Sequence, residues 1–467
     1  MKSKLEMITR RDMIAGSAAL GIWGAIPEPV CAMQPPPRGP QPPFEPSEGA
    51  NKPMGEGKGI FPGRVAWVHN PEVATWDGVT ERLAVKSATG EWWDDANCNP
   101  KIVDAMFSTA LRNITGKKSD KDAWDALFRH FNKTRGFKEA GYQAGEKIAI
   151  KINQNFDRSN TQPWISGRGM HSPQAVHALL RGLVQAGVPG KDITVFDAAN
   201  DRYISDPIYG RIKGDPDPRL HEINFQVSPN RATSTRPAVV PDTTDPIKFS
   251  DPKVGECYQP VCVVEAKYRI NMAVLRGHDI CGVTLCAKNN NGTIYWPVKN
   301  YWGPAVYHRY IAKNRGLPAY NALVDIMAHR QIGGKGLLYI IDGLYAAGQS
   351  ETNVVRWESF GDQWTASLFM SQDPVAIDSV GLDFIRCEPR EEGVHGAGHP
   401  DNYLHEAALI GDAPSGTKYD PEQDGTFVTK SLGVHEHWNN AKEKKYSRNL
   451  GKKEGIELVA LKAKVAS

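Results

Sequence analysis

The sequence predicts an α/β fold: a mostly parallel sheet with flanking helices in Rossmann-like β-α-β units, plus irregular insertions and an irregular tail. Residues 146–153, EKIAIKIN, alternate apolar and polar side chains as a strand does. Residues 192–197, DITVFD, form a second such run, and a helical pattern lies between the two. A strand, a helix and a strand in this order require a parallel sheet with a right-handed crossover.

The helix of this unit has clear start and stop signals. Ser172-Pro173 places a hydroxyl at the N-cap and proline at the first helical position. Gly187 ends the helix where a C-terminal glycine is expected. The apolar residues between them recur at helical spacing, namely Ala175, Val176, Leu179, Leu180, Leu183 and Val184.

Later segments repeat this pattern. Residues 268–275, 336–342 and 367–370 are predicted strands, and a helix begins at 374 with Asp373 as its N-cap. Ligands of open parallel sheets gather beyond the carboxyl ends of the strands. The predicted strand ends offer polar side chains there, namely Asn153, Asp197 and Asp342.

Composition excludes several classes of protein. The chain has 467 residues, of which 40% are hydrophobic and 23% charged, as in ordinary globular proteins. A net charge of +3 and the lack of a basic run argue against nucleic-acid binding. The chain has neither G-x-G-x-x-G nor G-x-x-x-x-G-K-[ST], so a nucleotide site of standard type is not expected.

The start of the chain predicts export. Residues 9–14, TRRDMI, resemble the twin-arginine signal, and the uncharged stretch 14–26 is too short to span a bilayer. Residues 30–32, VCA, offer small residues for cleavage. We therefore expect passage through the twin-arginine (Tat) export machinery to the periplasm or another extracytoplasmic compartment. After cleavage the protein should not be an integral membrane protein.

Several motifs resemble those of the domain of unknown function 362 family. Residues 270–292, INMAVLRGHDICGVTLCAKNNNG, are similar to the family pattern IN-x-P-K-x-K-x-H-x-x-x-G-x-T-x-x-x-KN-x-x-G. KINQN at 151–155, HSPQAVHALLRGLVQAG at 171–187 and the S-x-DPVA-x-D segment at 371–378 resemble further family motifs in the same order. The resemblance covers about residues 145–387. It implies a shared core but no reaction, because the family has no settled one.

Two departures from the family accompany the resemblance. Ala273, Val274 and Arg276 stand where the pattern tends to have proline, lysine and lysine. The chain also lacks the ferredoxin-type cysteine motifs that some members carry.

We divide the chain into a signal peptide (1–32), a proline-rich linker (33–63), an N-terminal segment (64–144), the family α/β core (145–387) with an insertion at about 207–260, and a C-terminal extension (388–467).

Six residues are predicted to form a catalytic cleft at the strand ends. Lys151 and Asn153 alternate at the end of one strand, where an ammonium and an amide suit an anionic group. His278 follows another strand and is a candidate general base or metal ligand. Lys288, Asn289 and Asp342 complete the set. The alternatives are solvated strand ends and, for Lys288 and Asn289, the cap of a short helix.

Metal binding is considered separately. His395, His399 and His405 fall within eleven residues, with Asp401 among them, and are the candidate metal ligands. His435 and His437 alternate as in a strand and should share a face. The six cysteines after residue 32 contain no C-x-x-C, so we expect one or two disulfides or buried thiols and no iron–sulfur motif.

The sequence therefore predicts an exported α/β protein with a small-molecule ligand at the strand ends. One reading is an enzyme that performs acid–base or metal-assisted chemistry on a small anionic or sugar-like substrate. Another is a non-catalytic periplasmic module that binds a ligand or metal. A third is an envelope interaction protein. The cofactor is unassigned, and a divalent metal remains open.

Overall fold

The computed structural model describes residues 44–154, 167–199, 203–295, 305–349, 352–390, 393–394 and 398–463. The predicted signal peptide, residues 1–32, lies outside these ranges. In the described residues no helix is long and apolar enough to cross a membrane.

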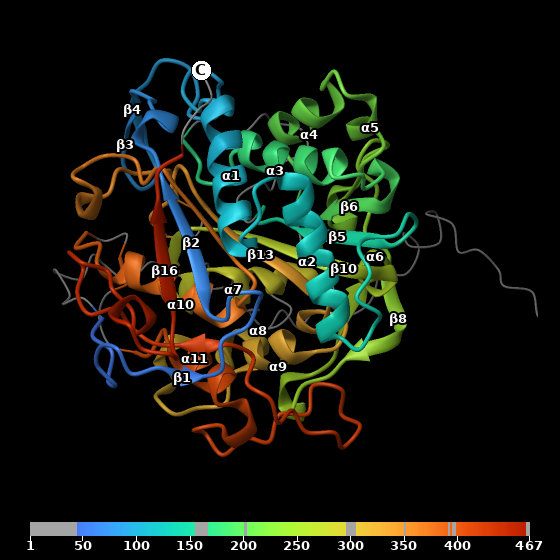
Figure 1. The fold of residues 1–467 in the computed structure, drawn as a ribbon, viewed down its shortest axis with the longest axis vertical. Coiled ribbons are helices and arrows are strands. Elements are labelled where there is room, and N and C mark those ends of the chain that lie inside the picture. The colour runs from blue at the N-terminus through green and yellow to red at the C-terminus, as the bar shows by residue number, and fades with distance from the viewer. Residues whose placement is uncertain are drawn as a thin grey trace, which may run out of the picture. The chain divides into compact units, whose positions relative to one another are not determined.

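An eight-stranded mixed sheet organises the molecule (Figure 1). Strand β14 is antiparallel to both of its neighbours, and the other strands run parallel to one another. This confirms the predicted α/β fold with a mostly parallel sheet. The order across the sheet is β16 (Glu457–Leu461), β2 (Arg64–His69), β14 (Ser367–Ser371), β13 (Gly336–Gly343), β10 (Ala266–Val274), β5 (Lys147–Lys151), β6 (Ile193–Phe196) and β7 (Asn224–Gln226).

Helices cover both faces of this sheet, and short strands outside it pair with one another in two-stranded sheets. The helices are α1 (Pro100–Thr115), α2 (Asp120–Thr134), α3 (Pro173–Gln185), α4 (Asp206–Lys213), α5 (Pro218–His221), α6 (Val261–Glu265), α7 (Cys286–Asn289), α8 (Ala305–Arg309), α9 (Ala322–Ala328), α10 (Pro374–Arg386) and α11 (Asn402–Ala408). The short strands are β1 (Met54–Gly55), β3 (Val79–Thr80), β4 (Val85–Ser87), β8 (Pro241–Ile247), β9 (Cys257–Pro260), β11 (Arg276–His278), β12 (Gly282–Thr284) and β15 (Val434–His435).

Two large apolar cores lie between the sheet and the helices that cover it. In Figure 1 helices α1, α2 and α3 lie in front of the sheet, and one core joins them to it. Helices α7, α9, α10 and α11 share the second core, in which α10 packs on β13 and β14. The sheet is therefore covered on both faces, and almost every residue of its central strands β5, β10, β13 and β14 is buried.

Local signals account for the helices that were predicted. The Ser172 hydroxyl accepts a hydrogen bond from the Ala175 amide, and Pro173 begins α3. The Asp373 carboxylate caps α10 by accepting from the amides of Val375 and Ala376. Both predicted N-caps are confirmed.

The ends of the chain complete the sheet. Strand β2 belongs to the N-terminal segment and β16 to the C-terminal extension, and the two pair in parallel from Arg64 opposite Glu457 onward. Strand β7 of the predicted insertion adds the opposite edge. From Phe44 on, the segment assigned to the linker packs on the C-terminal extension, because Phe44 is buried and β1 pairs with β15. These additions are part of the same folded unit as the family core.

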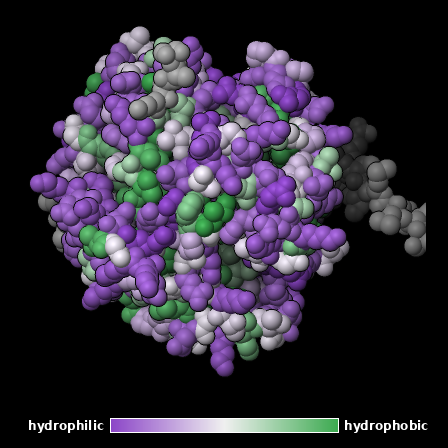
Figure 2. Space-filling view, in the orientation of Figure 1, coloured by the Kyte–Doolittle hydropathy of each residue, from purple (hydrophilic) through white to green (hydrophobic). Residues whose placement is uncertain are grey.

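The cysteines are thiols in this structure. In the described part of the chain all six are free, and Cys98, Cys257, Cys281 and Cys286 are buried. Of the two expected alternatives, disulfides or buried thiols, the structure shows buried thiols at these four positions. On the face shown in Figure 2, polar residues cover most of the surface and apolar ones form small separate patches.

Candidate functional site

Four of the six predicted cleft residues meet at the carboxyl ends of β5, β10 and β13. These strands are adjacent, so their ends share one edge of the sheet. Hydrogen bonds and ion pairs join the polar side chains there into one system. We call it the sheet-edge network, and it consists of Lys151, Asn153, His171, Asp197, Arg276, Asn289 and Asp342.

Lys151 is the charged centre of one half of the network. Its side chain is 1% exposed, and its Nζ lies 3.2 Å from Asp197 Oδ2. The same nitrogen donates to Asn289 Oδ1 at 3.0 Å and to the Ile152 carbonyl at 2.5 Å. One ion pair and two hydrogen bonds thus fix the position of the ammonium. Lys151 is therefore held rigidly in place.

The Met272 carbonyl links this half to Asp342. It accepts from Asn289 Nδ2 at 2.9 Å and lies 3.0 Å from His171 Nε2. The other ring nitrogen of His171 is 3.3 Å from Asp342 Oδ2. Asp342 also accepts from the Ser172 amide at 2.9 Å. The predicted carboxylate therefore orients the start of α3 and the His171 ring.

Arg276 completes the network on the side of β11. It is fully buried and donates to Asn153 Oδ1 at 2.7 Å and to the Gly169 carbonyl at 3.0 Å. Gly169 lies two residues before His171, so the chain itself connects the two halves. A buried guanidinium of this kind gives the edge a fixed positive charge.

Helix α7 brings Lys288 and Asn289 to this edge. The Asp378 carboxylate accepts from the amides of Cys286 and Ala287, both at 2.8 Å, and so holds the first turn of α7. Asp378 itself lies on α10 in the S-x-DPVA-x-D motif. Two family motifs are thus in direct contact, because Asp378 of the S-x-DPVA-x-D motif positions the helix that carries Lys288 and Asn289.

His278 is a half-buried residue on β11 with a defined tautomer. Its Nδ1 accepts from the backbone amides of Ile280 at 3.1 Å and Cys281 at 3.3 Å. Burial, together with the positive charge of Lys288, holds the pKa of His278 well below its usual range. The ring is therefore neutral near pH 7, and its proton is on Nε2. In this state His278 is a hydrogen-bond donor rather than a general base.

Positive groups gather around His278. Four of them are close enough to lower its pKa, namely Lys288, His308, Arg276 and Lys313. Lys288, His308 and Lys313 are half-buried, whereas Lys151 and Arg276 are buried. The His278 side of the site is therefore both its positive side and the side nearer to solvent.

Several polar atoms at this edge lack a protein partner. Gln154 is fully buried, and in the described ranges neither its amide oxygen nor its amide nitrogen has a hydrogen-bond partner. The same holds for Asn291 Oδ1 and Thr284 Oγ1. Buried polar groups are nearly always satisfied, so orphaned atoms point to a bound molecule or water. Gln154 lies beside the network, because its backbone amide donates to Asp197 Oδ2 at 2.9 Å.

Of the predicted metal trio, the structure describes only His399 and His405. His395 lies outside the described residues, and His399 belongs to none of the ligand groups identified among the residues described. His405 instead lies near Glu48, Asp401, His435 and His437. We call these five residues the histidine–carboxylate cluster. The prediction relied on closeness in sequence, whereas the cluster joins three separate segments.

Sequence reasoning missed some of the site. His171 and Gln154 were not singled out, although both belong to motifs that resemble the family. The strand-end rule identified residues directly after strands, and His171 instead precedes a helix. Glu48 carried no signal, because its partners lie hundreds of residues away.

The comparisons with known proteins agree with the motifs. The model of the family described as "Domain of unknown function (DUF362)" matches residues 148–383. That span contains every member of the sheet-edge network. A search of the curated proteins finds no match. The chain belongs to the domain of unknown function 362 family.

Proposed function

We propose that the protein is exported through the twin-arginine pathway and binds a small, oxygen-rich anion at the sheet edge, on which it performs acid–base chemistry. The export part rests on residues 9–14 and the short apolar stretch after them. The binding part rests on one observation: positive groups surround His278, and the same sheet edge holds the buried Gln154 amide, which has no partner among the described residues.

The donor set favours an anion over a metal cation at this edge. Its side chains are ammonium, guanidinium and amide groups, which hold carboxylate or phosphate oxygens by charge and hydrogen bonding. The two carboxylates already have partners, Asp197 with Lys151 and Asp342 with His171. A divalent cation would meet positive charge here, so metal-assisted chemistry is less favoured at the sheet edge.

The groups nearest to solvent suggest how acid–base chemistry would proceed. Lys288 and His278 Nε2–H are the hydrogen-bond donors that an anionic ligand would meet first, and of the two only the Lys288 ammonium could also transfer a proton. The buried Lys151 and Arg276 would supply the fixed charge behind them. The ligand would therefore be oriented with its negative group toward the sheet.

A thermal-shift screen tests binding. The protein is mixed with small carboxylates, phosphates and sugar acids, with neutral sugars as a comparison. We expect a subset of the anions to raise the melting temperature and the neutral sugars not to. Lys288→Gln should weaken the best anion at least about tenfold, because it removes a charge-assisted contact. Lys101→Gln, which removes an exposed charge on α1, should bind as wild type. Equal binding by both variants would refute the site.

Turnover separates an enzyme from a binding module. If the bound anion is converted, His278→Ala should reduce the rate at saturating ligand far more than it reduces affinity. If the anion binds and no product forms under any condition tested, the non-catalytic ligand-binding module is the better account.

A further inference from the structure

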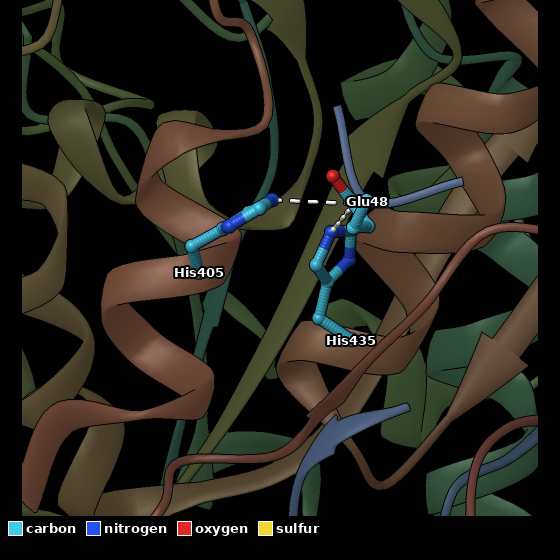
Figure 3. A group of neighbouring side chains, drawn as sticks. All are labelled: Glu48, His405 and His435. Atoms are coloured by element: carbon cyan, nitrogen blue, oxygen red, sulfur yellow. Dashed lines mark hydrogen bonds and ion pairs between the residues drawn. The ribbon is translucent and has the colours of Figure 1, made fainter. Parts of the chain in front are cut away.

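The residues of the histidine–carboxylate cluster lie outside the span matched by the family model and have the composition of a metal centre. Asp401 is the N-cap residue of α11, and His405 lies one turn later on this helix. His435 and His437 flank the end of β15, and Glu48 comes from the segment before β1. Asp401, His405, His435 and His437 are each at most 7% exposed, and the Glu48 side chain is 12% exposed. In Figure 3 the rings of His405 and His435 approach the Glu48 carboxylate from two sides.

The distances are those between neighbouring ligands of one ion. Glu48 Oε1 lies 3.0 Å from His437 Nε2, 3.2 Å from His435 Nε2 and 3.3 Å from His405 Nε2. Asp401 Oδ2 lies 3.5 Å from His405 Nε2. Metal–ligand bonds of about 2.1 Å separate adjacent ligand atoms by about 3.0 Å in an octahedron and about 3.4 Å in a tetrahedron. Two sets of three ligand atoms, Glu48 with His405 and His435 and Glu48 with Asp401 and His437, each lie within 4.8 Å of one another, and Glu48 belongs to both sets.

A hydrogen bond from a residue outside the cluster orients the His435 ring so that its Nε2 faces Glu48. The Ser379 hydroxyl donates its proton to the Val375 carbonyl at 2.8 Å. At 2.8 Å from His435 Nδ1, the same hydroxyl must therefore accept from an Nδ1–H. The Nε2 of His435 lies 3.2 Å from Glu48 Oε1, and with the proton on Nδ1 it would offer its lone pair to an ion bound between them. Metal-ligating histidines are oriented in this way by an outer partner.

Asp383 does the same for His437. Its Oδ1 lies 2.6 Å from His437 Nδ1, and a carboxylate can only accept, so the proton is on Nδ1. Asp383 is itself fixed by the Trp438 amide at 3.0 Å and the Tyr446 hydroxyl at 2.8 Å. Two of the three histidines therefore present Nε2 to the same point.

Orphaned atoms at that point are the independent sign of a ligand. Among the residues that the structure places, no hydrogen bond is made by His405 Nε2, His437 Nε2 or either oxygen of Asp401, although all are buried. Their neighbours are close, as the distances above show, but not in hydrogen-bond geometry. A cation among these atoms would satisfy them together.

We propose that Glu48, Asp401, His405, His435 and His437 bind one divalent first-row transition-metal ion. Three imidazoles and two carboxylates suit manganese, iron, nickel or zinc, whereas calcium and magnesium prefer oxygen shells and soft ions prefer thiolates. Five protein ligands exceed the four of a structural zinc site, so the ion is five- or six-coordinate. Two carboxylates also neutralise its charge, as a buried site requires. The ion joins Glu48 to a histidine 387 positions later in the chain.

Metal titration of the full chain tests the site. Metal is first removed with a chelator, and Mn²⁺, Zn²⁺ or Co²⁺ is then added, with Ca²⁺ and Mg²⁺ as comparisons. We expect one transition-metal ion per chain and no stoichiometric binding of Ca²⁺ or Mg²⁺ at the same concentration. The Co²⁺ form should show the weak visible absorption of five- or six-coordination. Failure of the wild-type chain to bind any of these transition metals at one equivalent would overturn the proposal.

Matched variants locate the ion. His405→Gln and Glu48→Gln should each weaken binding at least about tenfold. Each control makes the same substitution at a nearby residue outside the cluster. His399 precedes α11, and Glu45 is an exposed residue three positions before Glu48, so the controls are His399→Gln and Glu45→Gln. Both controls should bind as wild type. If Glu48→Gln and His405→Gln also bind as wild type, the ion lies elsewhere and the assignment is wrong.

Ser379→Ala tests the orientation argument separately. Loss of the Ser379 hydroxyl frees the His435 ring, so metal affinity should fall about tenfold. The melting temperature of the metal-free protein provides the check on folding, and it should change far less than that of the metal-loaded protein. An unchanged metal affinity in Ser379→Ala would contradict the claim that Ser379 orients His435 for metal binding. If His405→Gln does not fold, Glu48→Gln, which changes the most exposed residue of the cluster, still decides the outcome.

Discussion

The sheet-edge network leaves no room for a side chain at Gly292. A Cβ at this position would lie 2.3 Å from both Asp197 Oδ1 and Lys151 Cε. The Gly292 carbonyl also accepts from the Ala198 amide at 2.8 Å. The glycine that closes the KN-x-x-G motif is thus required by the approach of backbone to a buried ion pair.

Gly292→Ala should therefore destabilise the protein by about 1–3 kcal/mol, because the ion pair must shift to admit a methyl group. Gly210→Ala is the matched control: Gly210 is exposed on α4, and an added Cβ meets nothing within 4 Å. That change should stabilise the protein by up to about 1 kcal/mol. Denaturant unfolding measures both, and a loss of similar size at the two positions would contradict the close contact.

The pair of Lys151 and Asp197 makes a second prediction for single residues. Lys151→Met leaves a buried carboxylate without its cation, which should cost about 3 kcal/mol or more. Adding Asp197→Asn removes the leftover charge, and the carboxamide introduced there would retain an oxygen for the Gln154 backbone amide. The double variant should consequently be more stable than Lys151→Met alone. Additive losses in this double-mutant cycle would show that the two charges do not interact.

Element by element, the structure separates what is encoded locally from what is not. The strands and helices around 146–197 were predictable because alternation, Ser172-Pro173 and Gly187 act within a few residues. The pairing of β2 with β16 was not, since it joins residues nearly 400 positions apart and no local signal encodes a partner. The same limit applies to the sites. Lys151, Asn153 and Asp342 could be predicted because they lie at strand ends. Glu48 could not, because only the folded structure brings it next to its histidine partners.

Asp373 shows how one cap can serve several elements. Besides capping α10, its Oδ2 accepts from the Lys58 amide at 2.7 Å and from the Val434 amide at 3.2 Å. Asp373→Ala should cost more than an ordinary cap, about 2 kcal/mol or more. Ser119→Ala removes a simple cap of α2 in an exposed setting and should cost about 1 kcal/mol or less. Thermal or denaturant unfolding compares the two, and equal costs would contradict the linking role.

Taken as a whole, the molecule is larger than its family region. The match spans residues 148–383, yet β2 and β16 lie outside it and form one side of the sheet. Val65 and Ala66 of β2 are fully buried, so the core depends on them. The N-terminal segment and the C-terminal extension are thus structural parts of the domain, and the whole histidine–carboxylate cluster also lies outside the matched span.

A truncation tests this dependence. A chain of residues 145–387 lacks β2, β16 and α1, so it should leave β14 as a bare edge strand and expose its apolar face. We expect that fragment to aggregate or to lack a cooperative unfolding transition, while residues 44–467 unfold cooperatively. Circular dichroism during urea titration checks both chains. Cooperative unfolding of the fragment would show that the family region folds alone.

The central claim, that the sheet edge binds a small anion, is tested most directly by a crystal structure with the strongest anion of the thermal-shift screen. We predict that its negative group lies within hydrogen-bond distance of Lys288 and His278 Nε2, with a further contact to the Gln154 amide. Density for the anion at any other place, or none at a concentration that raises the melting temperature, would contradict the account.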